Sequence, residues 1–160
     1  MNNLKSRICN ASCILGVISA LLIFVALFLP AIDFSQFSEE IKLEYNLFKV
    51  CKNVRLISPI WTGIPVGIII GAVLMLVLSF IKIPLLKLIP NFVVIAMVII
   101  MLVDMGNIVS WAQDIVEMAK LDNQVIVNST KVYESFRAGI YMLAIGVVTG
   151  IVSCFMRTPE

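Results

Sequence analysis

The sequence predicts an all-α membrane protein, a bundle of four membrane-spanning helices with a small extracytoplasmic β-sheet. Of the 160 residues, 61% are hydrophobic and 14% are charged, which leaves too few polar side chains to cover a water-soluble globule. The charges are also unevenly spread, because none falls in residues 8–32, 56–81 or 138–156 and only Asp104 falls in 88–113. Each of these runs can cross the hydrocarbon as a helix, which takes about 20 residues.

We therefore expect a single membrane domain, residues 1–160, with spans at about 13–30, 60–81, 88–112 and 138–156. The first span has the basic start and apolar centre of a signal peptide. No small-x-small cleavage site follows it, and its apolar run is longer than usual, so we expect an uncleaved helix.

Basic residues in the short segments predict the orientation. The two long connections, 31–59 and 113–137, together hold seven basic and eight acidic residues and are nearly balanced. The short segments carry a basic excess, at Lys5, Arg7, Lys82, Lys87 and Arg157. Because basic residues favour the cytoplasmic side, both termini should be cytoplasmic in a cell membrane and both long connections should lie outside.

The outer loops are expected to be structured. Apolar and polar residues alternate from Ile41 to Leu47, which predicts a strand, and a second strand is expected at about Val54–Ile57. In the other loop, "QDIVEMAKL" keeps helical spacing and should continue the third span beyond the bilayer. "VIVNSTKVY", residues 125–133, is rich in β-branched residues and predicts a strand. Strands of the two loops are expected to pair.

The four predicted spans, the cytoplasmic ends and the segment "NLFKVC" at 46–51 resemble the claudin and peripheral myelin protein pattern, Gly-Leu-Trp-x-x-Cys. Leu47, Phe48 and Cys51 take the positions of its Leu, Trp and first Cys. Asn46 replaces the Gly, Phe48 replaces the Trp, and the second loop cysteine is missing. The resemblance implies a four-span architecture, and a shared architecture does not carry function with it.

Composition argues against catalysis. The chain has no histidine, which excludes His-based triads and HExxH zinc sites. Its four cysteines lack CxxC spacing, and no glycine-rich phosphate loop or basic patch suited to nucleic acid occurs. Only Cys51 lies in an outer loop, so no outer disulfide is expected. We expect a non-enzymatic protein without cofactor, metal or nucleic-acid partner.

Asp104 is the sharpest polar feature within a predicted span. It lies roughly 25 Å along the helix from Lys87, in the outer third of the membrane, and Asn107 shares its face. Acids within a membrane are candidate proton or cation sites. The alternative is a hydrated or packing role, with hydrogen bonds to Asn107, Thr62 or Tyr141.

Small residues four apart predict close helix packing, since glycine lets helix backbones approach within a membrane. The positions are Gly63, Gly67 and Gly71 on the second span and Gly146 and Gly150 on the fourth. These faces can pack inside the bundle or, on the second span, against another copy. Pro65 should bend the outer end of that span.

Function is expected to rest on lateral helix packing and extracytoplasmic binding, with the lipid bilayer and a membrane-protein partner or a second copy as partners. Candidate binding residues in the outer loops are Tyr45, Phe48 and Tyr133, with Phe34 and Phe37, all of which can instead pack against the bundle. Asn128 lies in a glycosylation sequon that would be used only in a eukaryotic secretory pathway. Two alternatives stay open: a small transport or channel subunit that uses Asp104, and a bacterial accessory or immunity-type membrane protein.

Overall fold

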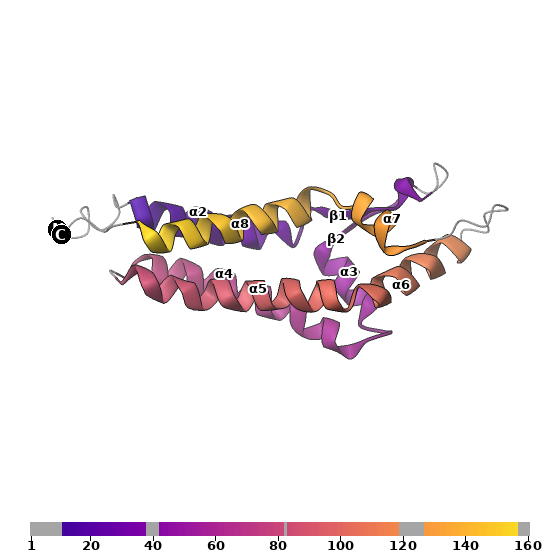
Figure 1. Ribbon diagram of the computed structural model, residues 1–160, viewed down its shortest axis with the longest axis horizontal. Coiled ribbons are helices and arrows are strands. Elements are labelled where there is room, and N and C mark those ends of the chain that lie inside the picture. Colours follow the sequence, from indigo (N-terminus) through magenta and orange to yellow (C-terminus); the bar gives the residue numbers. More distant parts are fainter. Residues whose placement is uncertain (1–10, 38–41, 82, 119–126, 157–160) are drawn as a thin grey trace.

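The computed structural model describes residues 11–37, 42–81, 83–118 and 127–156. Four long helices run side by side, and a smaller folded region extends from one end of them (Figure 1). The bundle helices are α2 (Ala11–Ala26), α4 (Gly63–Ser79), α5 (Leu88–Val103) and α8 (Ala138–Phe155). We call the described residues of 30–58 and 105–137 the head, and those of 11–19, 79–91 and 150–156, at the opposite end, the base.

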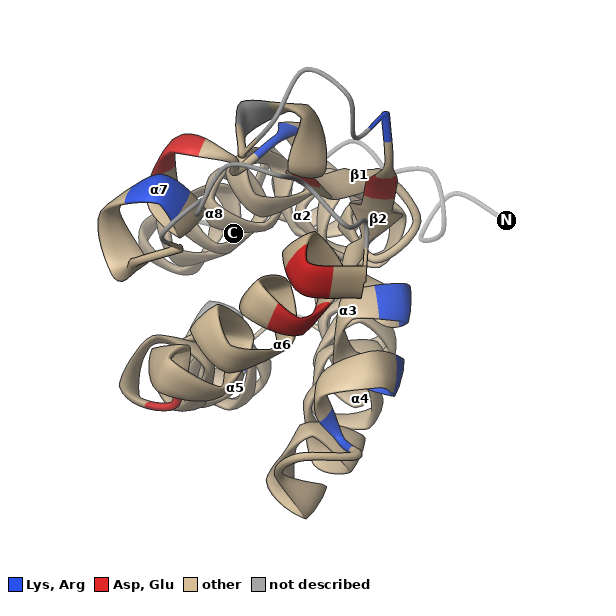
Figure 2. Ribbon diagram, turned by 90° about the vertical axis from the view of Figure 1, so that its right-hand side faces the viewer, with Lys and Arg blue, Asp and Glu red and all other residues tan. Residues whose placement is uncertain are grey.

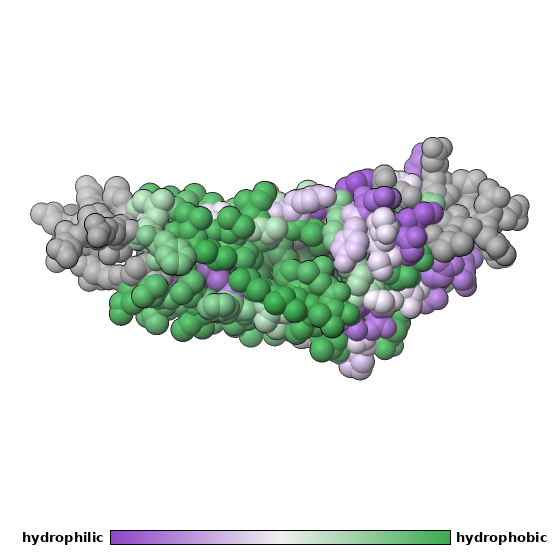
Figure 3. Space-filling model, in the orientation of Figure 1, coloured by the Kyte–Doolittle hydropathy of each residue, from purple (hydrophilic) through white to green (hydrophobic). Residues whose placement is uncertain are grey.

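Three helical stretches are long and apolar enough to cross a membrane: Pro59–Ser79, Leu85–Val103 and Ala138–Phe155. The first two include short 3₁₀ helices, η2 (Pro59–Thr62) and η3 (Pro84–Lys87). α2 is also apolar, and 16 of its residues are described. On the face shown in Figure 3, hydrophobic residues cover most of the bundle, and hydrophilic residues gather over the head. The prediction of a mostly helical chain with several apolar, span-length helices is confirmed to this extent.

Glycines bring the bundle helices together. α2 packs along α8 and α4, and α4 packs along α5. A Cβ added at Gly146 would lie 2.8 Å from Cγ1 of Ile23 and 3.1 Å from its backbone N, and one at Gly67 would lie 2.6 Å from the sulfur of Met97. Gly71 faces Val94 in the same way. Gly63 departs from the prediction, because no atom lies within 4 Å of its added Cβ.

The head contains one two-stranded antiparallel sheet, β1 (Pro30–Asp33) with β2 (Glu44–Asn46), followed by α3. Its other elements are η1 (Phe34–Gln36), α3 (Leu47–Val54), α6 (Met105–Met118) and α7 (Ser129–Glu134). The second long connection, residues 113–137, joins the sheet through one bridge, between Ile32 and Phe136. The prediction of a small sheet is confirmed, and the two loops meet at this bridge instead of through paired strands.

Two predicted strands are wrong, and capping explains both. Of the strand expected at Val54–Ile57, Val54 ends α3 and the other three residues form a turn after it. The first turn of α3 begins where the Asn46 side chain accepts the backbone N–H of Lys49 at 2.9 Å. The described part of "VIVNSTKVY" contains α7, capped in the same way by Asn128 on Lys131 N. Asparagine at an N-cap stabilises a helix start, and this local signal overrode the β-branched composition. Residues 119–126 lie outside the described chain.

The third predicted span is divided at Asp104. α5 ends there with ψ at 21°, and α6 then carries the helix on to Met118, so the helix expected beyond the span exists. Pro65 lies in the first turn of α4, directly after η2. Pro65 is the third residue of α4, where a proline removes no hydrogen bond from within that helix. The bend expected at this end of the span stays a prediction.

Candidate functional site

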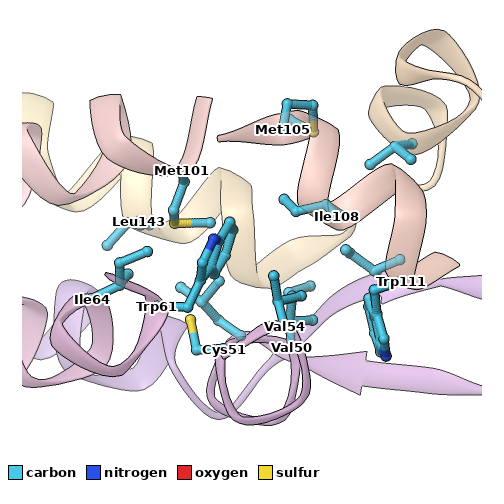
Figure 4. Close-up of a cluster of buried hydrophobic side chains, with 14 of the residues drawn as sticks. Val50, Cys51, Val54, Trp61, Ile64, Met101, Met105, Ile108, Trp111 and Leu143 are labelled. Carbon is cyan, nitrogen blue, oxygen red and sulfur yellow. The ribbon is translucent and has the colours of Figure 1, made fainter. Parts of the chain in front are cut away.

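Asp104 stands where the head meets the bundle. Its carboxylate accepts the indole N–H of Trp61 and, at 2.7 Å, the side-chain amide of Asn107. Trp61 is fully buried beside α3 and α5, among the side chains drawn in Figure 4. The acid therefore supplies the acceptor that a buried indole donor needs. Of the three partners expected for Asp104 in a packing role, the structure brings Asn107 to it; Tyr141 is exposed on α8.

An open pocket of about 400 Å³ lies on the other side of Trp61, between α3 and the start of α4. Its walls combine apolar and basic side chains. They come from Phe48, Cys51, Lys52, Arg55, Trp61, Thr62, Pro65 and Val66. Phe48, one of the predicted binding residues, is 45% exposed at its edge. This pocket was not predicted, because a strand was expected at Val54–Ile57, and it is the helix α3 that places these residues of 48–66 around one opening.

The other predicted binding aromatics divide into packed and exposed residues. Phe34 and Phe37 are buried, and Tyr45 is half-buried. Phe34, Tyr45 and Trp111 meet edge to face with ring centroids 5.3–5.4 Å apart, a favourable aromatic geometry. Tyr133 is 44% exposed on α7. Phe48 and Tyr133 are therefore the predicted aromatics that remain available to a partner.

An ion pair closes the head. Nη2 of Arg137 lies 2.6 Å from Oδ2 of Asp33, and the backbone N–H of Arg137 donates to the Ala31 carbonyl at 2.9 Å. Burial raises the pKa of Asp33, but hydrogen bonds from Ser35 and the pairing with Arg137 outweigh it and hold the pKa below its usual value. The ion pair thus links the connection 31–59 to the connection 113–137 next to strand β1.

A polar cluster is buried in the base. Lys87 is 1% exposed, and its ammonium donates to the carbonyl and the hydroxyl of Ser12 at 2.7 and 2.8 Å. The described residues contain one ion pair, that of Arg137 with Asp33, so no described carboxylate pairs with this lysine. Serine hydroxyls around it bond to helix carbonyls, as when Ser12 donates to Ser153 O and Ser19 to Gly146 O.

Asn91 belongs to the same cluster. Its side-chain N–H donates to the Lys87 carbonyl at 3.0 Å, while its Oδ1 is buried and has no hydrogen-bond donor among the described residues. Gly150 makes room for this amide, since an added Cβ would lie 2.7 Å from the Ser19 hydroxyl and still closer to Asn91. Sequence reasoning placed Lys87 in a connection between spans. The sequence signal that could have revealed this cluster is the i, i+4 spacing of Lys87 and Asn91, which puts both side chains on one helix face.

The cysteines of the described chain are buried free thiols. Cys13, Cys51 and Cys154 are buried and unbridged. Burial raises the pKa of the Cys51 thiol to about 12, so it is held as an unreactive thiol. Within the described residues no three His, Cys, Asp or Glu side chains lie close enough to hold a metal ion.

A second hollow, of about 90 Å³, opens between the α5–α6 junction and α8. α5 packs less extensively against α8 than against α4. The lining is almost wholly apolar and comes from Val98, Met101, Leu102, Met105, Ile108, Phe136, Ile140, Leu143 and Ala144. We call this hollow the lateral crevice. At this hollow the packing of α5 and α6 against α8 is incomplete.

The fold and these sites define a mostly helical chain with helices fit to cross a membrane and a small head at one end. Comparison with family models, with curated proteins and with solved structures finds no match for the chain. The segment "NLFKVC", on which the claudin resemblance rests, forms the cap and first turns of α3.

Proposed function

We propose that the chain is a four-span integral membrane protein that binds another membrane protein and catalyses no reaction. In this proposal α2 is the fourth span, both termini are cytoplasmic, the head is extracytoplasmic and the base faces the cytoplasm, as the basic residues of the short segments indicate. The observation that carries the proposal is the lateral crevice.

The crevice has the chemistry of a seat for a transmembrane helix. In a bilayer, helices associate by close van der Waals packing and not by exclusion of water. The crevice offers a recess with two walls, and Met101 and Met105 can adapt their side chains to an incoming surface. Leu102 is 47% exposed at its edge. A hollow of about 90 Å³ has room for an apolar side chain that projects from the helix of a membrane-protein partner; a second copy of the chain is the other occupant to test.

The packing of the glycines favours a partner-binding site that does not use the glycine face of α4. Gly67 and Gly71 pack against α5 within the bundle, and Gly146 and Gly150 pack against α2 and Asn91. A homo-oligomer seam on the glycines of α4 would need surface that α5 already covers. The crevice between α5 and α8 is therefore the better candidate for assembly.

Transport through Asp104 receives less support. Its carboxylate is occupied by Trp61 and Asn107, and the buried side chains below it, including Ile64, Ile68 and Val94, are apolar. A proton or cation path needs polar groups or water through the hydrocarbon. Loss of ion flux in liposomes on Asp104→Ala substitution would revive this alternative.

Site-specific photo-crosslinking in native membranes tests the binding proposal. A photoreactive residue at Leu102 or Ala144, on the two walls of the crevice, should capture the same membrane protein. One at Leu21, which is 56% exposed on α2, is the matched lipid-facing control. An adduct of twice the chain mass would identify a second copy as the occupant.

A second experiment fills the lateral crevice with a larger side chain. Ala144→Phe should abolish the adduct at Leu102 and leave the thermal unfolding of the protein intact, because Ala144 is exposed on α8. If Leu102, Ala144 and Leu21 all capture only lipid, or capture the same proteins equally, the crevice is not a binding site.

A further inference from the structure

We propose that the pocket between α3 and the start of α4 binds the phosphate-bearing headgroup of an anionic phospholipid. Of the side chains around its opening, Lys52 and Arg55 supply charge, and Phe48 and Val66 supply apolar surface. This inference shares with the proposed function only the position of the chain in a membrane, since the lateral crevice lies between other helices.

Unbalanced positive charge is the first argument. Lys49 and Lys52 on α3 and Arg55, directly after it, lie three apart in the sequence and are all exposed, while the buried stripe of α3 turns inward. Figure 2 shows their blue segments along the outer edge of the head. The one ion pair of the described residues lies elsewhere in the head. A guanidinium fork beside an ammonium is a favourable arrangement for phosphate oxygens.

Depth in the membrane is the second argument. Directly after Arg55 come Leu56, 82% exposed, and Ile57, 43% exposed, and Ile60 is 53% exposed on η2. Such a run of exposed apolar side chains is costly in water and favourable in hydrocarbon. Their burial in the bilayer sets the neighbouring Lys52 and Arg55 at the level of the lipid headgroups, where long basic side chains commonly lie.

The shape of the pocket distinguishes a lipid from a free anion. The floor is formed by Trp61 and Pro65, and Val66, which is 53% exposed, continues the apolar wall down α4. A phosphate ion would use only the basic rim, whereas a phospholipid would place its phosphate on the rim and its glycerol and first methylenes along Val66.

Native mass spectrometry of the purified full-length chain tests the site. Phosphatidylglycerol and phosphatidylcholine are titrated separately into delipidated protein, and bound lipid is counted. Wild type should prefer phosphatidylglycerol. Lys52→Gln/Arg55→Gln should weaken phosphatidylglycerol binding about tenfold or more and leave phosphatidylcholine unchanged, given the size of basic contacts to anionic lipid. Lys42→Gln/Lys131→Gln removes the same charge from the head outside the pocket and should change binding less than about twofold.

A further variant and a competitor complete the experiment. Thr62→Glu, at an exposed position of the pocket wall, should reduce phosphatidylglycerol binding by repulsion without touching the core. Millimolar inorganic phosphate should not displace the lipid. Equal loss in both double variants, absence of a preference in wild type, or displacement by phosphate alone would each overturn the proposal. None of these results bears on crosslinking at Leu102.

Discussion

The charged side chains at the two ends of the bundle are paired in opposite ways. At the head end, Asp104 is a half-buried acceptor that serves a buried donor, the indole of Trp61. In the base, Lys87 is a buried donor whose described partners, the carbonyl and hydroxyl of Ser12, bear no charge. Charge alone therefore does not decide which of the two sites loses more stability when it is changed. The cost of a change depends on what is left unpaired and on how much room the neighbours leave.

Overpacking the base should have the largest effect. Gly150→Val would push a branched side chain against Asn91 and Ser19, and we expect a loss of about 3 kcal/mol in the free energy of unfolding. Gly63→Val, at the head end of α4 where an added Cβ meets open space, should change it by less than about 0.5 kcal/mol. Unfolding in mixed micelles measures both. Equal losses would mean that the base is not tightly packed.

Removing the acceptor at the head end comes next. Asp104→Ala leaves the buried indole N–H of Trp61 without its partner, which should cost about 2 kcal/mol. Asp104→Asn keeps an acceptor oxygen and should cost about half as much. The control is Asp114→Ala, an exposed carboxylate on α6, with an expected change below about 0.5 kcal/mol. Similar unfolding curves for Asp104→Ala and Asp114→Ala would contradict the role given to this acid.

Acid should loosen the head before the base. The folded pKa of Asp33 lies below its unfolded value, so its contribution is complete above about pH 3.9 and is lost as pH falls through the folded pKa. The loss should be on the order of 1 kcal/mol, because the pair is partly exposed. Hydrogen exchange of residues 127–137 should quicken at low pH relative to α8. Asp33→Asn should remove this difference; persistence of the difference would assign it to another carboxylate.

The smallest change is expected at the most buried charge. Lys87→Met keeps the length of the side chain and removes a cation for which the described residues offer no carboxylate. Replacing a buried charge by an apolar side chain of similar volume is often neutral, so the free energy of unfolding should stay within about 1 kcal/mol. Loss of more than twice that amount in the same micelles would show that the bond to Ser12 outweighs the burial of the charge.

Hydropathy and charge gaps were enough to predict the apolar helices, and the four-residue spacing of small residues indicated the close approach at Gly67, Gly71, Gly146 and Gly150. They could not separate strand from helix in the head, where a single capping residue such as Asn46 or Asn128 outweighed the composition of the segment that follows. They also assigned Lys87 to a connection, because a one-dimensional profile treats every lysine near the end of a span as exposed. Its burial depends on serines and glycines brought by α2 and α8, which no local window contains.

The packing of α2 along α8 has a consequence for biosynthesis. The first bundle helix meets the last one, and the hydroxyl of Ser12 bonds to the carbonyl of Ser153, 141 residues later. During translation α2 must wait for the rest of the chain before it gains its main neighbour, and native contacts of such long range form late. Without α8, Ser12 and Ser19 of α2 would lose the carbonyls of Ser153 and Gly146 that accept their hydroxyl protons. α2 can therefore complete its hydrogen bonds only after the chain has been made through α8.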